Sequence, residues 1–217
     1  MSTPACEEIR GIREPLPEGE RVLWQGAPDW RSLAVRALHV RKLAIYFAAL
    51  VALRVALAAA DGESAAAAAA SAVWLVALAS AALGILALVA WLSARTTIYA
   101  ITTGRVVMRV GIALPIVVNL PHHAIESAAL RTYADGTGDL PLRLKGDVRL
   151  AYAHLWPHAR PWRLRHPEPM LRSLPGAAAV AETLARALAA AAQVPVQWRA
   201  TPSEQANAPA PGQPVTA

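Results

Sequence analysis

The chain has 217 residues, of which 55% are hydrophobic and only 17% are charged, and its formal net charge is +6. Such a small charged fraction is unusual for a water-soluble domain, and alanine, leucine and valine supply most of the apolar residues, since phenylalanine occurs once. The single cysteine excludes an internal disulfide framework and a zinc site built on paired cysteines. The composition therefore favours a membrane protein with a small folded domain.

Residues 1–42 are predicted to form a cytoplasmic N-terminal segment. The first 20 residues contain five glutamates and no apolar core, so they do not form a secretory signal, and internal helices must direct insertion. The stretch from Arg21 to Gln25 resembles a strand. The sequence leaves open whether this strand joins a later sheet or stays separate.

Residues 43–92 are predicted to form a transmembrane hairpin of two helices. Residues 43–60 are apolar except for Arg54, and residues 65–92 contain no charge. The acidic turn 61–64 separates the two, whereas arginines and lysines flank the hairpin outside it. By the positive-inside rule both termini are cytoplasmic, in a multi-pass protein of the bacterial inner or intracytoplasmic membrane.

Small residues at four-residue spacing predict that the two helices pack closely through one seam. The expected seam residues are Ala48, Ala52, Ala56 and Ala60 on the first helix and Ala77, Ser80, Ala81 and Gly84 on the second. Arg54 falls off this seam. Its charge is costly within a span, so it either reaches the headgroups or Asp61, or it faces a partner's transmembrane helix.

Residues 93–194 are predicted to form a cytoplasmic β-domain, because short strand-like runs alternate with glycine and proline turns. The predicted strands are Thr96–Thr102, Arg105–Val110, Pro115–Leu120, Ile125–Tyr133, Leu140–Lys145 and Val148–Leu155. A helix is predicted over Ala177–Ala192, with Val180, Leu184 and Leu188 on its apolar face. Residues 195–217, rich in proline, alanine and glutamine, are predicted to be a disordered tail.

Two sets of motifs resemble known families. Short strands closed by one C-terminal amphipathic helix are similar to a pleckstrin-homology-like barrel, and the motifs that carry this likeness are Tyr99–Thr102, Arg105–Gly111, Leu120–Pro121, Ile125–Glu126 and Gly136–Gly138. The fold class expected is therefore α+β, a two-helix hairpin plus an antiparallel barrel. The segments His39–Phe47, Arg131–Asp139, His154–Arg165 and Pro167–Leu171 resemble the PuhB-type photosynthetic-complex assembly proteins of purple bacteria.

The PuhB-type resemblance implies a non-catalytic factor for assembly of the reaction centre and core light-harvesting complex, with those subunits as partners. The alternative is a general membrane-tethered module that binds lipid or protein and has no link to photosynthesis. A homo-oligomer is also compatible with the sequence. No phosphate loop or nucleophile elbow occurs, so no enzyme activity and no cofactor are expected.

The segment from Trp156 to Arg165 is the candidate binding surface, because arginines alternate there with tryptophans and can hold phosphate or carboxylate beside an indole. The candidate partner- or lipid-binding residues are Trp156, His158, Arg160, Trp162, Arg163, Arg165 and Arg54. The basic excess can also attract anionic membrane lipids. The charges form no continuous stripe, so nucleic acid is not an expected partner.

Histidines leave a metal or tetrapyrrole alternative open. His154 and His158 are four residues apart and His166 is near, but Pro157 breaks the helix that would bring the first two onto one face. His122 and His123 are expected to be a surface pair. No metal site is predicted, and neither predicted span contains a histidine to ligate a pigment.

Overall fold

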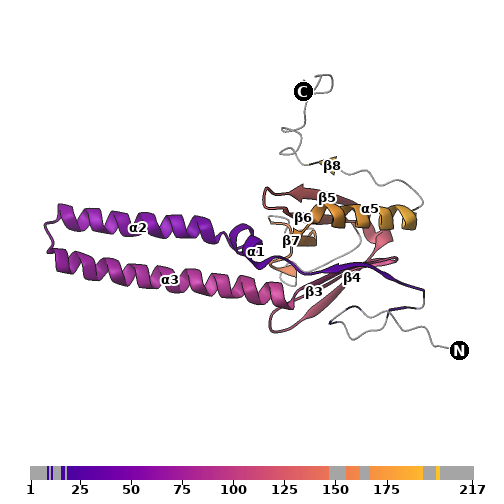
Figure 1. Ribbon diagram of the computed structural model, residues 1–217, viewed down its shortest axis with the longest axis horizontal. Coiled ribbons are helices and arrows are strands. Elements are labelled where there is room, and N and C mark those ends of the chain that lie inside the picture. Colours follow the sequence, from indigo (N-terminus) through magenta and orange to yellow (C-terminus); the bar gives the residue numbers. More distant parts are fainter. Residues whose placement is uncertain are drawn as a thin grey trace, which may run out of the picture. The chain divides into compact units, whose positions relative to one another are not determined.

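Figure 1 shows the computed structural model, which describes residues 9, 11, 16–17, 19–146, 155–161, 167–192 and 199–200. The chain divides into two units. One unit is helical and comprises Trp30–Arg95, and the other is a β-domain that combines Met1–Asp29 with Thr96–Ala217.

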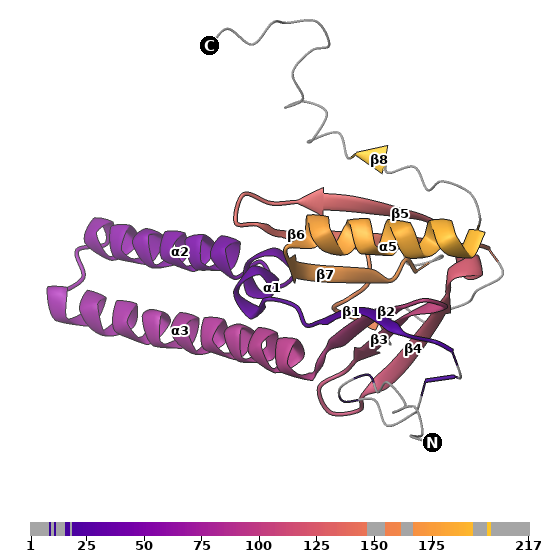
Figure 2. The ribbon, with the colours of Figure 1, turned by 45° about the vertical axis from the view of Figure 1, so that its right-hand side comes forward.

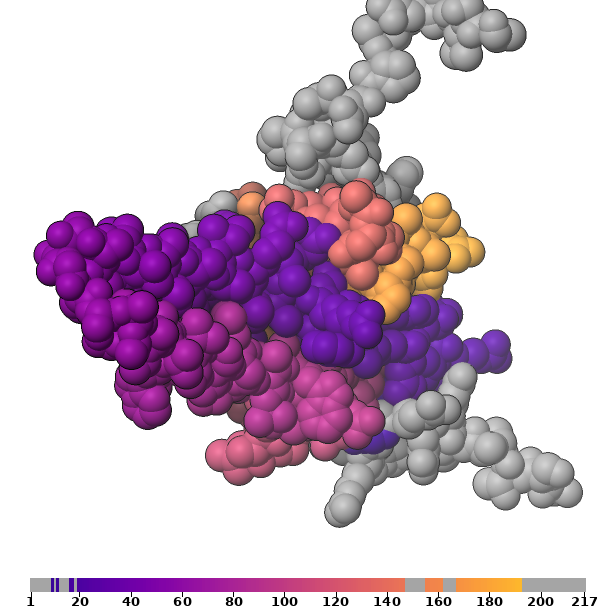
Figure 3. All heavy atoms as spheres, turned by 60° about the vertical axis from the view of Figure 1, so that its left-hand side comes forward, coloured from indigo at the N-terminus to yellow at the C-terminus, as the bar shows by residue number. Residues whose placement is uncertain are grey.

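The helical unit consists of α1 (Trp30–Arg36), α2 (Val40–Ala60) and α3 (Ala65–Thr96). Two of these helices, α2 and α3, are long and apolar enough to cross a membrane, as predicted, and none of the most apolar stretch of α3 is buried. In the space-filling view of Figure 3 their side chains lie in the open on the face shown. The sequence analysis did not predict α1.

The predicted seam of small residues is wrong. Ala48, Ala52 and Ala56 of α2 are all exposed, and so are Ala77 and Gly84 of α3. The least exposed stripe of α2 instead carries mostly larger side chains. It also carries Arg54, which was predicted to lie off the contact seam. This stripe consists of Phe47, Val51, Arg54 and Ala58.

The β-domain contains two sheets. The first has the order β1 (Val22–Gly26), β2 (Ile98–Thr102), β3 (Arg105–Val110) and β4 (Ile116–Pro121), and all neighbours in it are antiparallel. The strand near residue 22 therefore joins the sheet, and the two long helices are inserted between adjacent strands of it. This arrangement brings β1 beside β2 across more than 70 residues of intervening chain.

The second sheet has the order β7 (Met170–Pro175), β6 (Thr137–Leu144), β5 (Ile125–Thr132) and β8 (Arg199–Ala200), with β8 parallel to β5. A short helix, η1 (His122–Ala124), links β4 to β5. Among the described residues no strand pair joins the two sheets, so the expected closed barrel is not confirmed. Antiparallel sheets and the α+β class are as predicted.

The helix α5 (Ala177–Ala192) matches its predicted bounds, and its predicted apolar face is buried. It lies alongside β5 and β6 in both ribbon views (Figures 1 and 2). Its face joins a core with residues of both sheets, among them Tyr99, Ile101, Met108, Leu140 and Leu174. Residues 148–154 of the last predicted strand lie outside the described residues, and β7 was not predicted.

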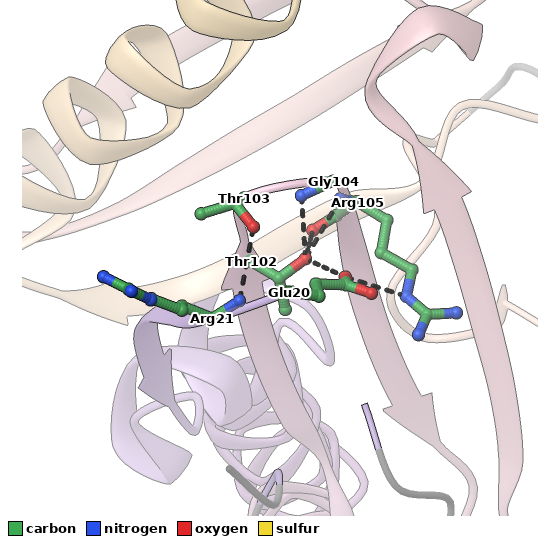
Figure 4. Close-up of polar contacts among 6 residues, drawn as sticks. All are labelled: Glu20, Arg21, Thr102, Thr103, Gly104 and Arg105. Carbon is green, nitrogen blue, oxygen red and sulfur yellow. Dashed lines mark hydrogen bonds and ion pairs between the residues drawn. The ribbon is translucent and has the colours of Figure 1, made fainter. Parts of the chain in front are cut away.

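A polar cluster holds the start of β1 against the β2–β3 turn (Figure 4). The Glu20 carboxylate accepts hydrogen bonds from the Thr102 hydroxyl and from Arg105 Nε, the latter at 3.0 Å. The backbone N–H of Thr103 donates to the carbonyl of Arg21 at 3.0 Å. Because Glu20 is nearly buried, these bonds fix the register at which the N-terminal strand enters the sheet.

Candidate functional site

The predicted binding surface is only partly described. Trp156, His158 and Arg160 belong to the described segment 155–161, whereas Trp162, Arg163 and Arg165 lie outside the described residues. The described part lies within the connection between β6, which ends at Leu144, and β7, which begins at Met170.

His158 anchors this segment from inside the domain. Its side chain is buried, with 1% of its surface exposed. Its Nε2 lies 3.0 Å from the hydroxyl of Thr97, and its Nδ1 lies 2.6 Å from the hydroxyl of Tyr99. Both partners are buried at the start of β2. These two hydrogen bonds therefore tie the segment to the start of β2, where the chain arrives from α3.

The hydrogens of this pair are assigned so that the buried tyrosine hydrogen has an acceptor. The Tyr99 oxygen accepts a hydrogen bond from the backbone N–H of Arg172 at 3.2 Å, and we assign the tyrosine hydrogen to the hydrogen bond with His158 Nδ1. The histidine hydrogen then sits on Nε2 and is donated to Thr97. Burial, with a smaller effect of the Arg172 charge, lowers the pKa of His158 to about 3. Burial also raises the pKa of Tyr99 well above its usual value. Both side chains are neutral at physiological pH.

The strand β7 completes the support. The guanidinium of Arg172 donates from Nη1 to the carbonyl of Pro157 at 2.8 Å, and the backbone N–H of Met170 donates to the carbonyl of His158 at 2.8 Å. The backbone N–H of Ser173 donates to Asp139 Oδ1 at 2.8 Å. Backbone and side-chain bonds thus hold both sides of the segment to β7.

The outer side of the segment presents an indole and a guanidinium. Trp156 is half exposed. Arg160 forms an ion pair with Glu168, with Nη1 and Oε2 2.7 Å apart, and its backbone N–H donates to the Glu168 carbonyl. The Arg160 side chain remains 46% exposed, whereas that of Glu168 is 9% exposed. An exposed tryptophan on the same segment as an arginine oriented by an ion pair suits recognition of a protein or a lipid headgroup.

The structure changes the role expected of His158. It was predicted among the residues that contact a partner, but burial and two internal hydrogen bonds leave it no surface to do so. It supports the segment on which Trp156 and Arg160 are displayed. A proton-transfer role is disfavoured too, because the imidazole is neutral and enclosed.

Arg54 lies in the other unit, where it reaches across the turn between α2 and α3. Its Nη2 donates to both carboxylate oxygens of Glu63, at 3.1 and 2.8 Å. Pairing with a nearby carboxylate was one of the predicted explanations for the Arg54 charge, with Asp61 as the expected partner. In the structure the partner is Glu63. The ion pair compensates the charge within the chain, and both side chains are about one-third exposed.

The other histidines are only partly described. Among the described residues no three His, Cys, Asp or Glu side chains come together, and His154 and His166 lie outside that set. The expected surface pair is half wrong, since His123 is exposed but His122 is buried. Burial lowers the pKa of His122, which the charge of Glu20 partly opposes.

Sequence reasoning missed Thr97, Tyr99 and Arg172 as parts of this site. Tyr99 stood in a motif that was interpreted as a strand and as part of the pleckstrin-homology-like resemblance, with no role in a site. Arg172 was not distinguishable from a surface arginine, because its burial depends on β7. The one available signal was the combination of a tyrosine in an otherwise apolar strand and a histidine next to proline.

Comparison with known proteins places this architecture in a family. The profile described as "Bacterial PH domain" matches residues 43–188, which is about two-thirds of the chain and includes both long helices. The chain belongs to this family of bacterial pleckstrin-homology domains.

A curated relative from Rhodobacter capsulatus is named "Uncharacterized 23.7 kDa protein in puhA 5'region". It is 39% identical to this chain over 178 residues, which cover 82% of this chain and 83% of the relative. The search of solved structures found no match.

Proposed function

We propose that this chain is a non-catalytic assembly factor for the photosynthetic reaction centre and its core light-harvesting complex, anchored by α2 and α3 in the inner or intracytoplasmic membrane. The observation that carries the proposal is similarity over most of the chain to a protein encoded beside puhA, a photosynthesis gene. The PuhB-type motifs in residues 131–139 and 154–171 point the same way.

In this proposal both termini and the β-domain lie in the cytoplasm, as the flanking basic residues indicate. The exposed indole of Trp156 and the guanidinium of Arg160 contact an immature reaction-centre subunit. Arg160 is already paired with Glu168, so the gain on binding is moderate, as suits a factor that must later dissociate.

The test is affinity purification of the tagged chain from mild detergent extracts of phototrophically grown membranes. Trp156→Ala and the triple variant Arg160/Arg163/Arg165→Ala are expected to recover less reaction-centre polypeptide than the unchanged chain. Arg143→Ala is the matched control, because Arg143 also forms a surface ion pair, with Glu126 at 3.2 Å. Equal loss in all variants, or no reaction-centre polypeptide with any, would contradict the proposal.

The family match also favours a second candidate, a general membrane-tethered lipid- or protein-binding module. This second candidate predicts that the affinity-purified chain carries anionic lipid and no reaction-centre subunits.

A further inference from the structure

The β3–β4 loop and the first two residues of β4 form an exposed apolar run. Residues 112–117 read Ile-Ala-Leu-Pro-Ile-Val, and all six are exposed. Leu114 is 81% exposed, which exceeds every large apolar residue of the two long helices. No polar or charged side chain interrupts this run. Consecutive exposed apolar residues are unfavourable in water and mark a surface that another apolar phase covers.

Strand register places this loop at one end of the first sheet. Ile98 at the start of β2 pairs with Arg109, and one position further along β3 Val110 pairs with Ile116. The loop between Val110 and Ile116 therefore projects past the start of β2, and Ile98 is only two residues beyond Thr96, the last residue of α3. Chain connectivity alone puts the apolar run at the end of the sheet where α3 arrives.

The shape of the loop is also defined. Gly111 has a positive φ of 117°, and a Cβ there would collide with the carbonyl of Leu114. Only glycine adopts this conformation readily, so the turn that presents Leu114 is built into the backbone. In α3 the guanidinium of Arg95 stacks 4.5 Å from the Trp91 ring, a pairing typical of a helix end at a membrane interface.

We infer that residues 112–117 insert into the interfacial layer of the bilayer, as a second contact of the β-domain with lipid beside the end of α3. The inference rests on the part of the proposed function in which α3 spans the membrane. The occupant is lipid because the run is wholly apolar, and because only Thr97 separates the membrane-length helix α3 from the strand β2 whose start the loop passes. Insertion stops at the interface, since the turn's peptide groups still need water or headgroup partners.

The test uses the full chain in liposomes of phosphatidylcholine and phosphatidylglycerol. Cys6, the single cysteine, is replaced by serine, and an environment-sensitive fluorophore is attached at Leu114→Cys. Gly104→Cys is the matched control, because it lies in the exposed turn at the opposite end of β2 and a Cβ there makes only ordinary contacts. Val76→Cys in α3 reports whether the helix is in the bilayer.

The inference predicts that nitroxide-labelled lipids quench the fluorophore at 114 but not at 104, and that 114 loses reactivity with aqueous dithionite.

A fluorophore at 114 as reactive as that at 104, with 76 quenched by lipid, would overturn the loop insertion and leave the membrane hairpin standing. If the fluorophore at position 76 were also exposed to water, α3 would not lie in the bilayer, and the inference would lose its premise. Shielding of 114 only when photosynthetic membrane proteins are added would assign the loop to a protein partner. Copurification of reaction-centre subunits tests the proposed function in a separate experiment, so the two can fail independently.

Discussion

The helical unit and the β-domain use the same apolar residue types in opposite ways. None of the leucines of α2 and α3 is buried, and Leu53 is 54% exposed, whereas Leu140, Leu171 and Leu184 of the β-domain are completely buried. The helices are apolar all round, while α5 buries one face and exposes the other. Total hydrophobicity therefore indicates the class of protein, whereas the distribution of apolar residues around each helix or strand indicates whether that element faces lipid or water.

The first prediction tests this contrast with one substitution made twice. Leu184→Ala removes a fully buried side chain of α5 and should lower the free energy of unfolding of the β-domain by about 2–5 kcal/mol. Leu53→Ala makes the same change at an exposed position of α2 and should leave the β-domain unaffected. Denaturant-dependent proteolysis in mild detergent measures both. Equal effects would contradict the assignment of Leu53 to a lipid-facing surface.

The polar interior of the β-domain gives the next effect. Tyr99→Phe leaves His158 Nδ1 and the backbone N–H of Arg172 without a partner and should cost about 1–3 kcal/mol of stability. Tyr46→Phe in α2, where the ring is 56% exposed, is the control and should cost nothing measurable. The same proteolysis assay reports both, and a silent Tyr99→Phe would show that the network does not hold the segment.

The pH dependence sharpens the same point. The pKa of His158 is about 3 in the folded chain and 6.5 as its ordinary value, so below pH 6.5 the unfolded chain binds a proton that the folded chain does not. Stability is complete above pH 6.5 and falls on acidification, by about 2 kcal/mol at pH 5. His158→Gln cannot titrate and should show a shallower slope between pH 7 and 5. Burial of His122 leaves a residual slope in the same direction.

The smallest effect is expected in the hairpin turn. Glu63→Gln removes the negative charge that faces Arg54, while Asp61→Asn removes one that forms no ion pair with it among the described contacts. The first change should raise exposure of the turn to hydrogen exchange slightly, and the second should not. An equal response to both would show that the Arg54–Glu63 pair contributes nothing.

Several elements were predictable because they follow local patterns. Long apolar runs, the first broken only by Arg54, predicted both long helices. The 3.6-residue period predicted α5, and residues 105–110 were found as β3 because turn residues bound them. The strand β7 was missed because five of its six residues are buried, Arg172 and Ser173 among them, so no alternation marks it.

Long-range contacts explain the remaining errors. The burial of His158 depends on Tyr99, 59 residues earlier, and on β7, and neither relation leaves a trace in local sequence. The partner of Arg54 was placed two residues too early in the acidic turn, because Asp61 was expected, but the turn folds back far enough to bring Glu63 to the arginine. The exposed apolar loop at 112–117 was divided between a turn and a predicted strand.

The most direct test of the central claim is pulse labelling in the organism that encodes this chain, with and without the gene. The account predicts that reaction-centre polypeptides are synthesised at the normal rate without the chain but enter the pigmented complex slowly, and that reintroducing the full-length chain restores assembly. Normal assembly kinetics in the deletion strain would contradict the claim and leave a membrane-tethered bacterial pleckstrin-homology domain with another task.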